Sequence, residues 1–416
     1  MWRAVTRVPR SLRGACVVVV LAWACAPASG EAPPAPYEVW LVDHPPRAPT
    51  MWQVNATYLS LYRGLGHALD EVRSAPLGQM IWVAVNGLVF YPITHEEGHR
   101  SVLTGAGIGA VSEPWFHRDG TARVTGVRDE ELQRLRDRDL PTYIRLHTAG
   151  LESDGALAAR AASLAAWEQD DADLLWPEVV LRRGGIMVYH ASGLFRWSPD
   201  LREEADELDS DVVGHDVYGA VRHLHRPTMP FRRYTDYEDL TFEERRFVRR
   251  VGWRTWLNLA SPMLWGRANW TLDSGRRWSG DLSYSLTPFG DMIEHAQWWA
   301  RPGQWGARVS LRAYQNEVHW FPGVGLEWCD LRPMVRCASR VALHGWQQPK
   351  DLRFRTAHGE WGGAVEAGVR WRVTDTKSAP TGYILLGALV KTKGYQPEAP
   401  ELDASFGVRG GFAFRF

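Results

Sequence analysis

The last third of the chain alternates apolar and polar residues with a period of two, which is the period of a β-strand. From about Gly266 onward, runs such as GDLSYSLTPFG, GARVSLRAYQN and AVEAGVRWRVTD repeat this pattern. In the second run Val309 and Leu311 alternate with Arg308 and Arg312. Side chains two residues apart share one face of a strand, so each run predicts a strand with one apolar and one polar face.

Turn signals such as RPGQ, QQPKD, TKSAP and QPEAP divide this region into about eight to ten strands, each about ten residues long. That length and alternation are more typical of a membrane β-barrel than of a soluble sheet. Arg308, Arg312, Arg370 and Arg372 should then face a polar interior, because charged side chains facing lipid destabilise a barrel. A soluble sandwich, or an open sheet packed on the other half of the chain, is the alternative.

The chain ends GFAFRF, which places Phe412, Phe414 and Phe416 on one face of the last strand. This ending resembles the terminal strand of bacterial outer-membrane barrels, whose final aromatic residue is read by the barrel-assembly machinery. The resemblance covers roughly the last third of the chain. It implies an outer-membrane location, with that machinery as a partner.

The first 30 residues have the composition of an export signal. Four arginines precede the short apolar run ACVVVVLAWACA, and the small residues APASG follow it. After removal of residues 1–30, the remaining cysteines are Cys329 and Cys337. Because an exported chain meets oxidising surroundings, we expect these two to form a disulfide.

The chain therefore reads as an α+β protein in two parts that follow the signal peptide. Residues 31–260 have mainly helical periodicity, and residues 261–416 should form the antiparallel barrel or barrel-like sheet. Thr241 with Glu244 has capping-box spacing at the start of one helix, and Gly150 is the expected end of another. Lys plus Arg equals Asp plus Glu at 48 each, which argues against a nucleic-acid partner.

The helical part contains the segment THEEGHRSVLTG. Pro92 suits the first turn of a helix, and His95 and His99, four residues apart, then lie on one face. Two imidazoles so placed can bind Zn²⁺, and Glu96 can accept a proton from water activated by the metal. Glu97 lies on a different side of the helix and has no such role.

This HExxH segment resembles that of the zincin metallopeptidases, and the resemblance covers this helix only. It implies a third protein ligand, which in the gluzincin branch is a glutamate from a second helix. Glu152 is the first choice for that ligand, followed by Asp154 and His147, although the spacing of Glu152 and Asp154 departs from the gluzincin pattern. The third histidine of the metzincins is absent from HEEGHRSVLTGAGIG.

Two further segments bear on the site. The stretch DSDVVGHDVYGAVRHLHRP offers additional polar side chains that could contact a reaction intermediate: Asp209, Asp211, His215, Asp216, Tyr218, His223 and His225. Residues 74–94 carry no charge, and we expect them to form a buried core helix beneath the metal site.

These features predict an exported zinc-dependent peptidase of a Gram-negative-type envelope, with a periplasmic helical domain and a barrel in the outer membrane. Its substrate would be a peptide or protein. One alternative is a non-enzymatic barrel or anchor protein with a helical interaction domain. A second is a protein similar to the site-2-type intramembrane proteases, because an uncharged segment precedes the zinc motif.

Overall fold

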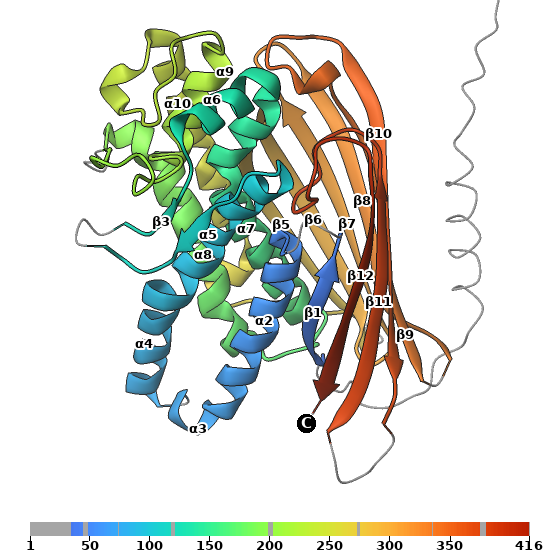
Figure 1. Ribbon diagram of the computed structural model, residues 1–416. Helices are drawn as coiled ribbons and strands as arrows, with labels where there is room; N and C mark the ends of the chain where they lie inside the picture. Colours follow the sequence, from blue (N-terminus) through green and yellow to red (C-terminus); the bar gives the residue numbers. More distant parts are fainter. Residues whose placement is uncertain are drawn as a thin grey trace, which may run out of the picture.

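The computed structural model describes residues 35–44, 49–73, 75–117, 121–198, 203–272, 275–334, 336–374 and 380–415. The expected signal peptide, residues 1–30, lies outside this part of the chain. The fold is α+β, with a helical layer packed against one face of a large antiparallel sheet (Figure 1).

The helical layer is built from α-helices of 4 to 27 residues. Its α-helices are α2 (Met51–Ala68), α3 (Asp70–Arg73), α4 (Pro76–Val85), α5 (Tyr91–Gly105), α6 (Asp129–Arg138), α7 (Leu140–Ala166), α8 (Ala172–Phe195), α9 (Asp216–His225) and α10 (Phe242–Arg254). The 3-10 helices are η2 (Tyr237–Asp239), η3 (Thr255–Ala260), η4 (Pro262–Trp265) and η6 (Lys350–Leu352). The predicted capping box starts α10: the Thr241 hydroxyl accepts from the Glu244 N–H, and the Glu244 carboxylate accepts from the Thr241 N–H.

Helices α4 and α5 form one continuous helix, because the π-helical turn η1 (Asn86–Phe90) joins them. Among the described residues this helix, Pro76–Gly105, is the one long and apolar enough to cross a membrane. Only 22% of its most apolar window is buried. The expectation of a buried core helix is therefore wrong for α4, which presents much of its apolar surface to the outside.

The expected helix end at Gly150 is also wrong, since α7 runs through this residue to Ala166. Gly150 instead permits a close approach of α7 to α5. A Cβ atom at Gly150 would lie 2.4 Å from Nε2 of His95, and one at Gly98 would lie 2.5 Å from the carbonyl oxygen of Ala149. The two glycines thus bring the metal-motif helix against the middle of α7.

Ten strands form the large sheet, which confirms the predicted antiparallel architecture. They are β1 (Tyr37–Asp43), β4 (Trp270–Thr271), β5 (Arg277–Thr287), β6 (Gly290–Arg301), β7 (Trp305–Gln315), β8 (Trp320–Met334), β9 (Cys337–Pro349), β10 (Gly359–Arg372), β11 (Thr381–Lys391) and β12 (Ser405–Arg415). Strands β5 to β12 pair in chain order, and β1 adds to β12. A separate hairpin pairs β2 (Val111–Glu113) with β3 (Arg123–Thr125).

The sheet is not closed into a barrel, which corrects that part of the prediction. In the described chain β1 and β4 are its two edges. Strand β1 comes from the segment expected to be mainly helical, and it pairs with the last strand, β12, so the sheet includes residues from both parts of the chain.

The two faces of the sheet differ in polarity, as the alternation predicts. Leu311, Leu386 and Phe406 on the outer face are each more than half exposed. The inner face lines a cavity of about 320 Å³ shared with α2, α7 and α8. Arg308 and Arg312 reach into it and pair with the same glutamate, Glu294 of β6.

The prediction that the strand arginines face a polar interior is confirmed for three of the four. Arg370 also lines the cavity and pairs with Asp330 at 2.7 Å. Arg372, two residues beyond Arg370 on the same strand, is not among the residues that line it.

Side chains from the helical layer satisfy some of the backbone groups near the two edges of the sheet. On β1, the N–H groups of Glu38 and Trp40 donate to hydroxyls of α2, those of Ser60 (2.9 Å) and Thr57 (3.1 Å). The short strand β4 covers only the start of β5, and beyond it the Tyr284 N–H of β5 donates to the side-chain oxygen of Asn258 at 3.3 Å. An open edge normally exposes unpaired backbone groups, and these contacts with the helical layer satisfy three of them.

The expected disulfide is not formed, because Cys329 and Cys337 are both free and buried in the structure. Cys329 pairs across the strands with Gly306 and packs in the core against the helices. Cys337 instead pairs with Met334 at the other end of the β8–β9 connection. The connection between the two strands therefore does not bring the two thiols together.

We predict that Asn258→Ala lowers the free energy of unfolding by about 2–3 kcal/mol, since it leaves buried partners on η3 and β5 unsatisfied. Asn258 is 1% exposed, accepts from Arg183 at 2.9 Å and donates to the carbonyl oxygen of Thr255 at 2.9 Å. Denaturant unfolding measures the change. Asn269→Ala is the control, because Asn269 is half-buried and makes only long contacts of 3.4–3.5 Å. Equal stability of the two variants would contradict the inference that the hydrogen bonds of Asn258 stabilise the contact between η3 and β5.

Candidate metal centre

His95 and His99 lie one turn apart on α5, with ring centroids separated by 5.2 Å. The helical spacing predicted from the sequence is therefore realised. Both side chains are buried, at 3% and 1% exposed. The His95 ring is stacked between two tyrosines, Tyr91 at 5.7 Å and Tyr189 at 5.6 Å, which fixes its plane.

Each imidazole uses its Nδ1 atom for a hydrogen bond to the protein. Nδ1 of His95 lies 2.8 Å from Oδ2 of Asp154, and Nδ1 of His99 lies 2.7 Å from the carbonyl oxygen of Leu146. Both partners accept, so Nδ1 is the donor on each ring and Nε2 is the atom left to bind a cation. Metal-binding histidines are typically oriented by such carboxylate or carbonyl partners.

Asp216, the first residue of α9, supplies a third donor to these two Nε2 atoms. Its Oδ2 lies 3.4 Å from Nε2 of His95 and 3.7 Å from Nε2 of His99. One ligand atom from each of the three buried residues lies within 4.8 Å of the others. The group His95, His99 and Asp216 could therefore hold a metal ion.

The surroundings fit a cation. Oδ2 of Asp216 is buried and has no hydrogen-bond partner in the described structure, which is costly for an acceptor without a cation or proton nearby. Gly150 leaves open the space next to Nε2 of His95 that a Cβ atom would fill. Two imidazoles and one carboxylate are also the donor set of many catalytic zinc sites, which keep a further position open.

The acid–base properties of the site without a metal reflect its excess of carboxylates. Burial opposes a charged imidazole at His95, but Asp154 and Asp216 outweigh it and raise the pKa of His95 well above its usual range. Burial likewise disfavours the Asp216 carboxylate, but His99 and His95 lower its pKa overall. A proton on His95 thus takes the place that a cation could occupy.

Glu96 and Tyr189 flank this group. Burial raises the pKa of Glu96 well above its usual range, and Asp211 and Asp216 add to this effect while His95 opposes it. Burial also raises the pKa of the Tyr189 hydroxyl, with the Asp216 and Glu96 carboxylates adding to it. The raised pKa means that Glu96 holds a proton more tightly than an exposed glutamate, and the raised pKa of Tyr189 keeps its hydroxyl a hydrogen-bond donor at neutral pH.

The three candidates for the third ligand lie elsewhere. The carboxylate of Glu152 is occupied by Arg145, at 2.6 and 2.9 Å, and by the N–H of Glu398 at 2.7 Å. Asp154 supports His95 from behind, and His147 stacks on His223 with ring centroids 5.5 Å apart. In the structure Asp216, rather than Glu152, is grouped with the two imidazoles, and Asp154 accepts from Nδ1 of His95.

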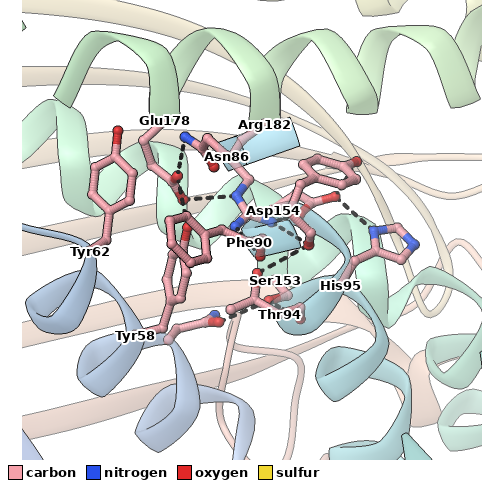
Figure 2. A network of polar contacts seen from close by, with 12 residues as sticks. Tyr58, Tyr62, Asn86, Phe90, Thr94, His95, Ser153, Asp154, Glu178 and Arg182 are labelled. Carbon is pink, nitrogen blue, oxygen red and sulfur yellow. Dashed lines mark hydrogen bonds and ion pairs between the residues drawn. The ribbon is translucent and has the colours of Figure 1, made fainter. Parts of the chain in front are cut away.

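A buried polar network holds Asp154 in place (Figure 2). Arg182 of α8 donates to Oδ1 of Asp154 at 2.8 Å and to Glu178 at 2.9 Å. The Tyr91 hydroxyl donates to Oδ2 of Asp154 at 2.8 Å. Asp154 therefore bridges α5, α7 and α8 behind the His95 ring.

The same arginine stabilises the irregular turn before the metal motif. Arg182 donates to the carbonyl oxygens of Tyr91 (2.9 Å) and Phe90 (3.4 Å), which lie at the junction of the π-helix and α5. Asn86 of the π-helix donates to Glu178 at 3.0 Å, as Figure 2 shows. These contacts fix the start of α5 relative to α8, and thereby the position of His95 along α5.

Sequence reasoning singled out the segment of Asp216 but gave the residue no metal role. The local sequence contains an N-cap for α9, His215, and Asp216 is the first residue of that helix. The cap does not predict that Asp216 lies next to the imidazoles of α5, because that depends on packing between helices. Tyr189 was missed, because nothing in its local sequence distinguishes it from other helical tyrosines.

Comparison with known protein families, with curated proteins and with solved structures finds no match to the chain.

We predict that Asp216→Asn abolishes stoichiometric zinc binding, because an amide oxygen is a weaker zinc donor than a carboxylate. Glu152→Gln is the matched control and should keep one zinc per chain, since its carboxylate points to Arg145. Zinc content after purification and titration of metal-free protein measure both. Loss of zinc in Glu152→Gln alone, with the fold intact by circular dichroism, would restore Glu152 as the ligand.

Proposed function

We propose that this protein is a zinc-dependent hydrolase that cleaves peptide bonds. The observation that carries the proposal is the convergence of His95, His99 and Asp216 on one point, with Glu96 next to it. The zincin-like motif supplies two of the donors and the base, and the fold supplies the third donor. A Zn²⁺ ion bound there would act as a Lewis acid and make a water-derived nucleophile available at neutral pH.

The protein side chains around this point would each have a separate role in the reaction. Glu96 would accept a proton and later return it to the leaving amine, for which its raised pKa is suitable. Tyr189 would donate a hydrogen bond to the carbonyl oxygen of the substrate, because its hydroxyl remains protonated. Asp154 and the Leu146 carbonyl would hold the two imidazoles with Nε2 toward the metal.

We also propose that the protein resides in the outer membrane of a Gram-negative-type envelope. The support is the polarity of the sheet, since strands β7 to β12 present apolar side chains outward and charged pairs inward, as membrane strands do. The last described strand carries Phe412 and Phe414, consistent with recognition by barrel-assembly machinery.

A second candidate function is that of a non-enzymatic envelope protein in which the metal stabilises the helical layer. The burial of the site favours it, because each of the three donors is at most 3% exposed. A closed, fully buried site is typical of structural zinc. The half-buried Tyr189 beside His95 favours a catalytic site instead.

Exchange of the candidate base separates the two functions. We predict that Glu96→Gln keeps its zinc but loses roughly 100- to 10,000-fold in peptide hydrolysis, the usual contribution of a general base. Glu97→Gln should keep full activity, because Glu97 pairs with Arg100 on another side of α5. Cleavage of casein or of a mixed peptide library is the assay. Equal activity of Glu96→Gln and the wild type would exclude the catalytic role, and the absence of hydrolysis in the zinc-loaded wild type would favour a structural metal.

The membrane location has its own test. We predict that the protein remains in the membrane fraction after osmotic shock and is extracted only by detergent, because its sheet exposes an apolar face. Heated and unheated samples should migrate differently in a denaturing gel, as compact membrane β-proteins do. A protein released freely by osmotic shock would contradict the location without affecting the hydrolase proposal.

A further inference from the structure

Helix α4 exposes an apolar surface with no charged residue. Leu77 and Met80 are about 70% exposed, Ile81 is 53% exposed, and Leu88 of the adjoining π-helix is 63% exposed. Residues 75–94 contain no Asp, Glu, Lys or Arg. Soluble monomers rarely keep a contiguous apolar surface of this kind open to water, so a partner must cover it.

Helix α4 and the sheet lie on different sides of the molecule. In Figure 1 α4 lies on the side of the helical layer that is farthest from the sheet. The 3-10 helices η3 and η4, which contact β5 and α8, expose Leu259 (38%) and Trp265 (73%). Exposed apolar side chains thus occur on the sheet, on η3 and η4 and on the helical layer.

We propose that the acyl chains of a bilayer cover both the outer face of the sheet and α4, so that lipid contacts the molecule on opposite sides. This inference rests on the outer-membrane location proposed above. A single protein partner docked on one side would leave the other apolar side exposed, whereas a bilayer surrounds an embedded body. Three backbone N–H groups near the two edges of the sheet donate to side chains of the helical layer, which lowers the number of unpaired groups that could face lipid.

The length of α4 limits how far the contact extends. Its ten residues span about 15 Å, roughly half of the hydrocarbon thickness, so α4 inserts into the bilayer rather than crossing it. Its continuation, α5, is largely buried among the helices and carries the metal motif. The candidate metal centre would consequently lie close to the boundary between bilayer and water.

Single-cysteine variants of the full chain test the proposal. In a background with the native cysteines replaced by alanine, Met80→Cys reports on α4, Leu386→Cys on the outer face of the sheet, and Arg134→Cys on the polar surface of α6. Each carries an environment-sensitive fluorophore in liposomes of phosphatidylethanolamine and phosphatidylglycerol. Lipids brominated along their acyl chains serve as the quencher, and circular dichroism with zinc content checks the fold.

We expect bromolipids to quench the probes at positions 80 and 386 strongly and to leave the probe at position 134 unchanged. Quenching at 386 but not at 80 would overturn the inference while leaving the membrane location intact, and a cross-link between two chains through position 80 would then identify a second copy as the partner. Absence of quenching at both positions would overturn the location itself and the inference with it. Zinc content and hydrolysis are measured on the same samples, so either failure remains distinct from a failure of the hydrolase proposal.

Discussion

The buried ion network of Arg182 is the interaction on which the candidate site depends. Arg182 is fully buried and pairs with both Glu178 and Asp154. Burial of a guanidinium is costly unless carboxylates and further hydrogen bonds compensate for the lost water, and here two carboxylates and two backbone carbonyls do so. Removal of the arginine would leave two buried carboxylates without a counter-charge. The orientation of His95 through Asp154 is therefore tied to the stability of the helical layer.

This network also contacts the irregular segment that precedes the metal motif. Helix α5 follows directly on the π-helix, and Pro92 in its first turn has no N–H to donate. A carbonyl oxygen has two lone pairs, so those of Phe90 and Tyr91 can accept from Arg182 in addition to a helical hydrogen bond. The guanidinium thereby ties the start of α5 to α8, close to His95.

Local features of the chain were predictable from the sequence, and long-range ones were not. The period-two runs predicted the strands and their inner arginines, because alternation depends only on neighbouring residues. Whether the sheet closes depends on helices that seal its edges, such as α2 against β1, and no strand sequence contains that information. A free pair of cysteines and an exposed α4 likewise depend on packing.

The same distinction applies to the third residue of the group that could hold a metal ion. The shared helix face of His95 and His99 follows from their spacing alone, whereas Asp216 comes from a helix that follows much later in the chain. Glu152 and Asp154 both lie on α7, but two helical positions differ by about 200° around the axis. The two side chains therefore point to opposite sides. Asp154 faces α5 and His95, while Glu152 faces Arg145 and the loop of Glu398. The directions in which these two side chains point depend on α7 continuing through Gly150. Because a helix end was expected at Gly150, these directions could not be predicted.

Charged side chains are paired differently in the cavity along the sheet and in the candidate site. Along the cavity, Glu294 pairs with Arg308 and Arg312, so neighbouring side chains neutralise its negative charge. At the site, Asp154 has Arg182, but Oδ2 of Asp216 faces only the two imidazole nitrogens. Each of those nitrogens is the free one of its ring, because Nδ1 is engaged elsewhere. Three electron-pair donors that converge without a resident positive side chain repel one another unless a proton or a cation lies between them. A proton can lie between only two of these atoms at a time, whereas a divalent metal ion can bind all three. That difference favours a bound metal ion over a shared proton as the reason for this arrangement.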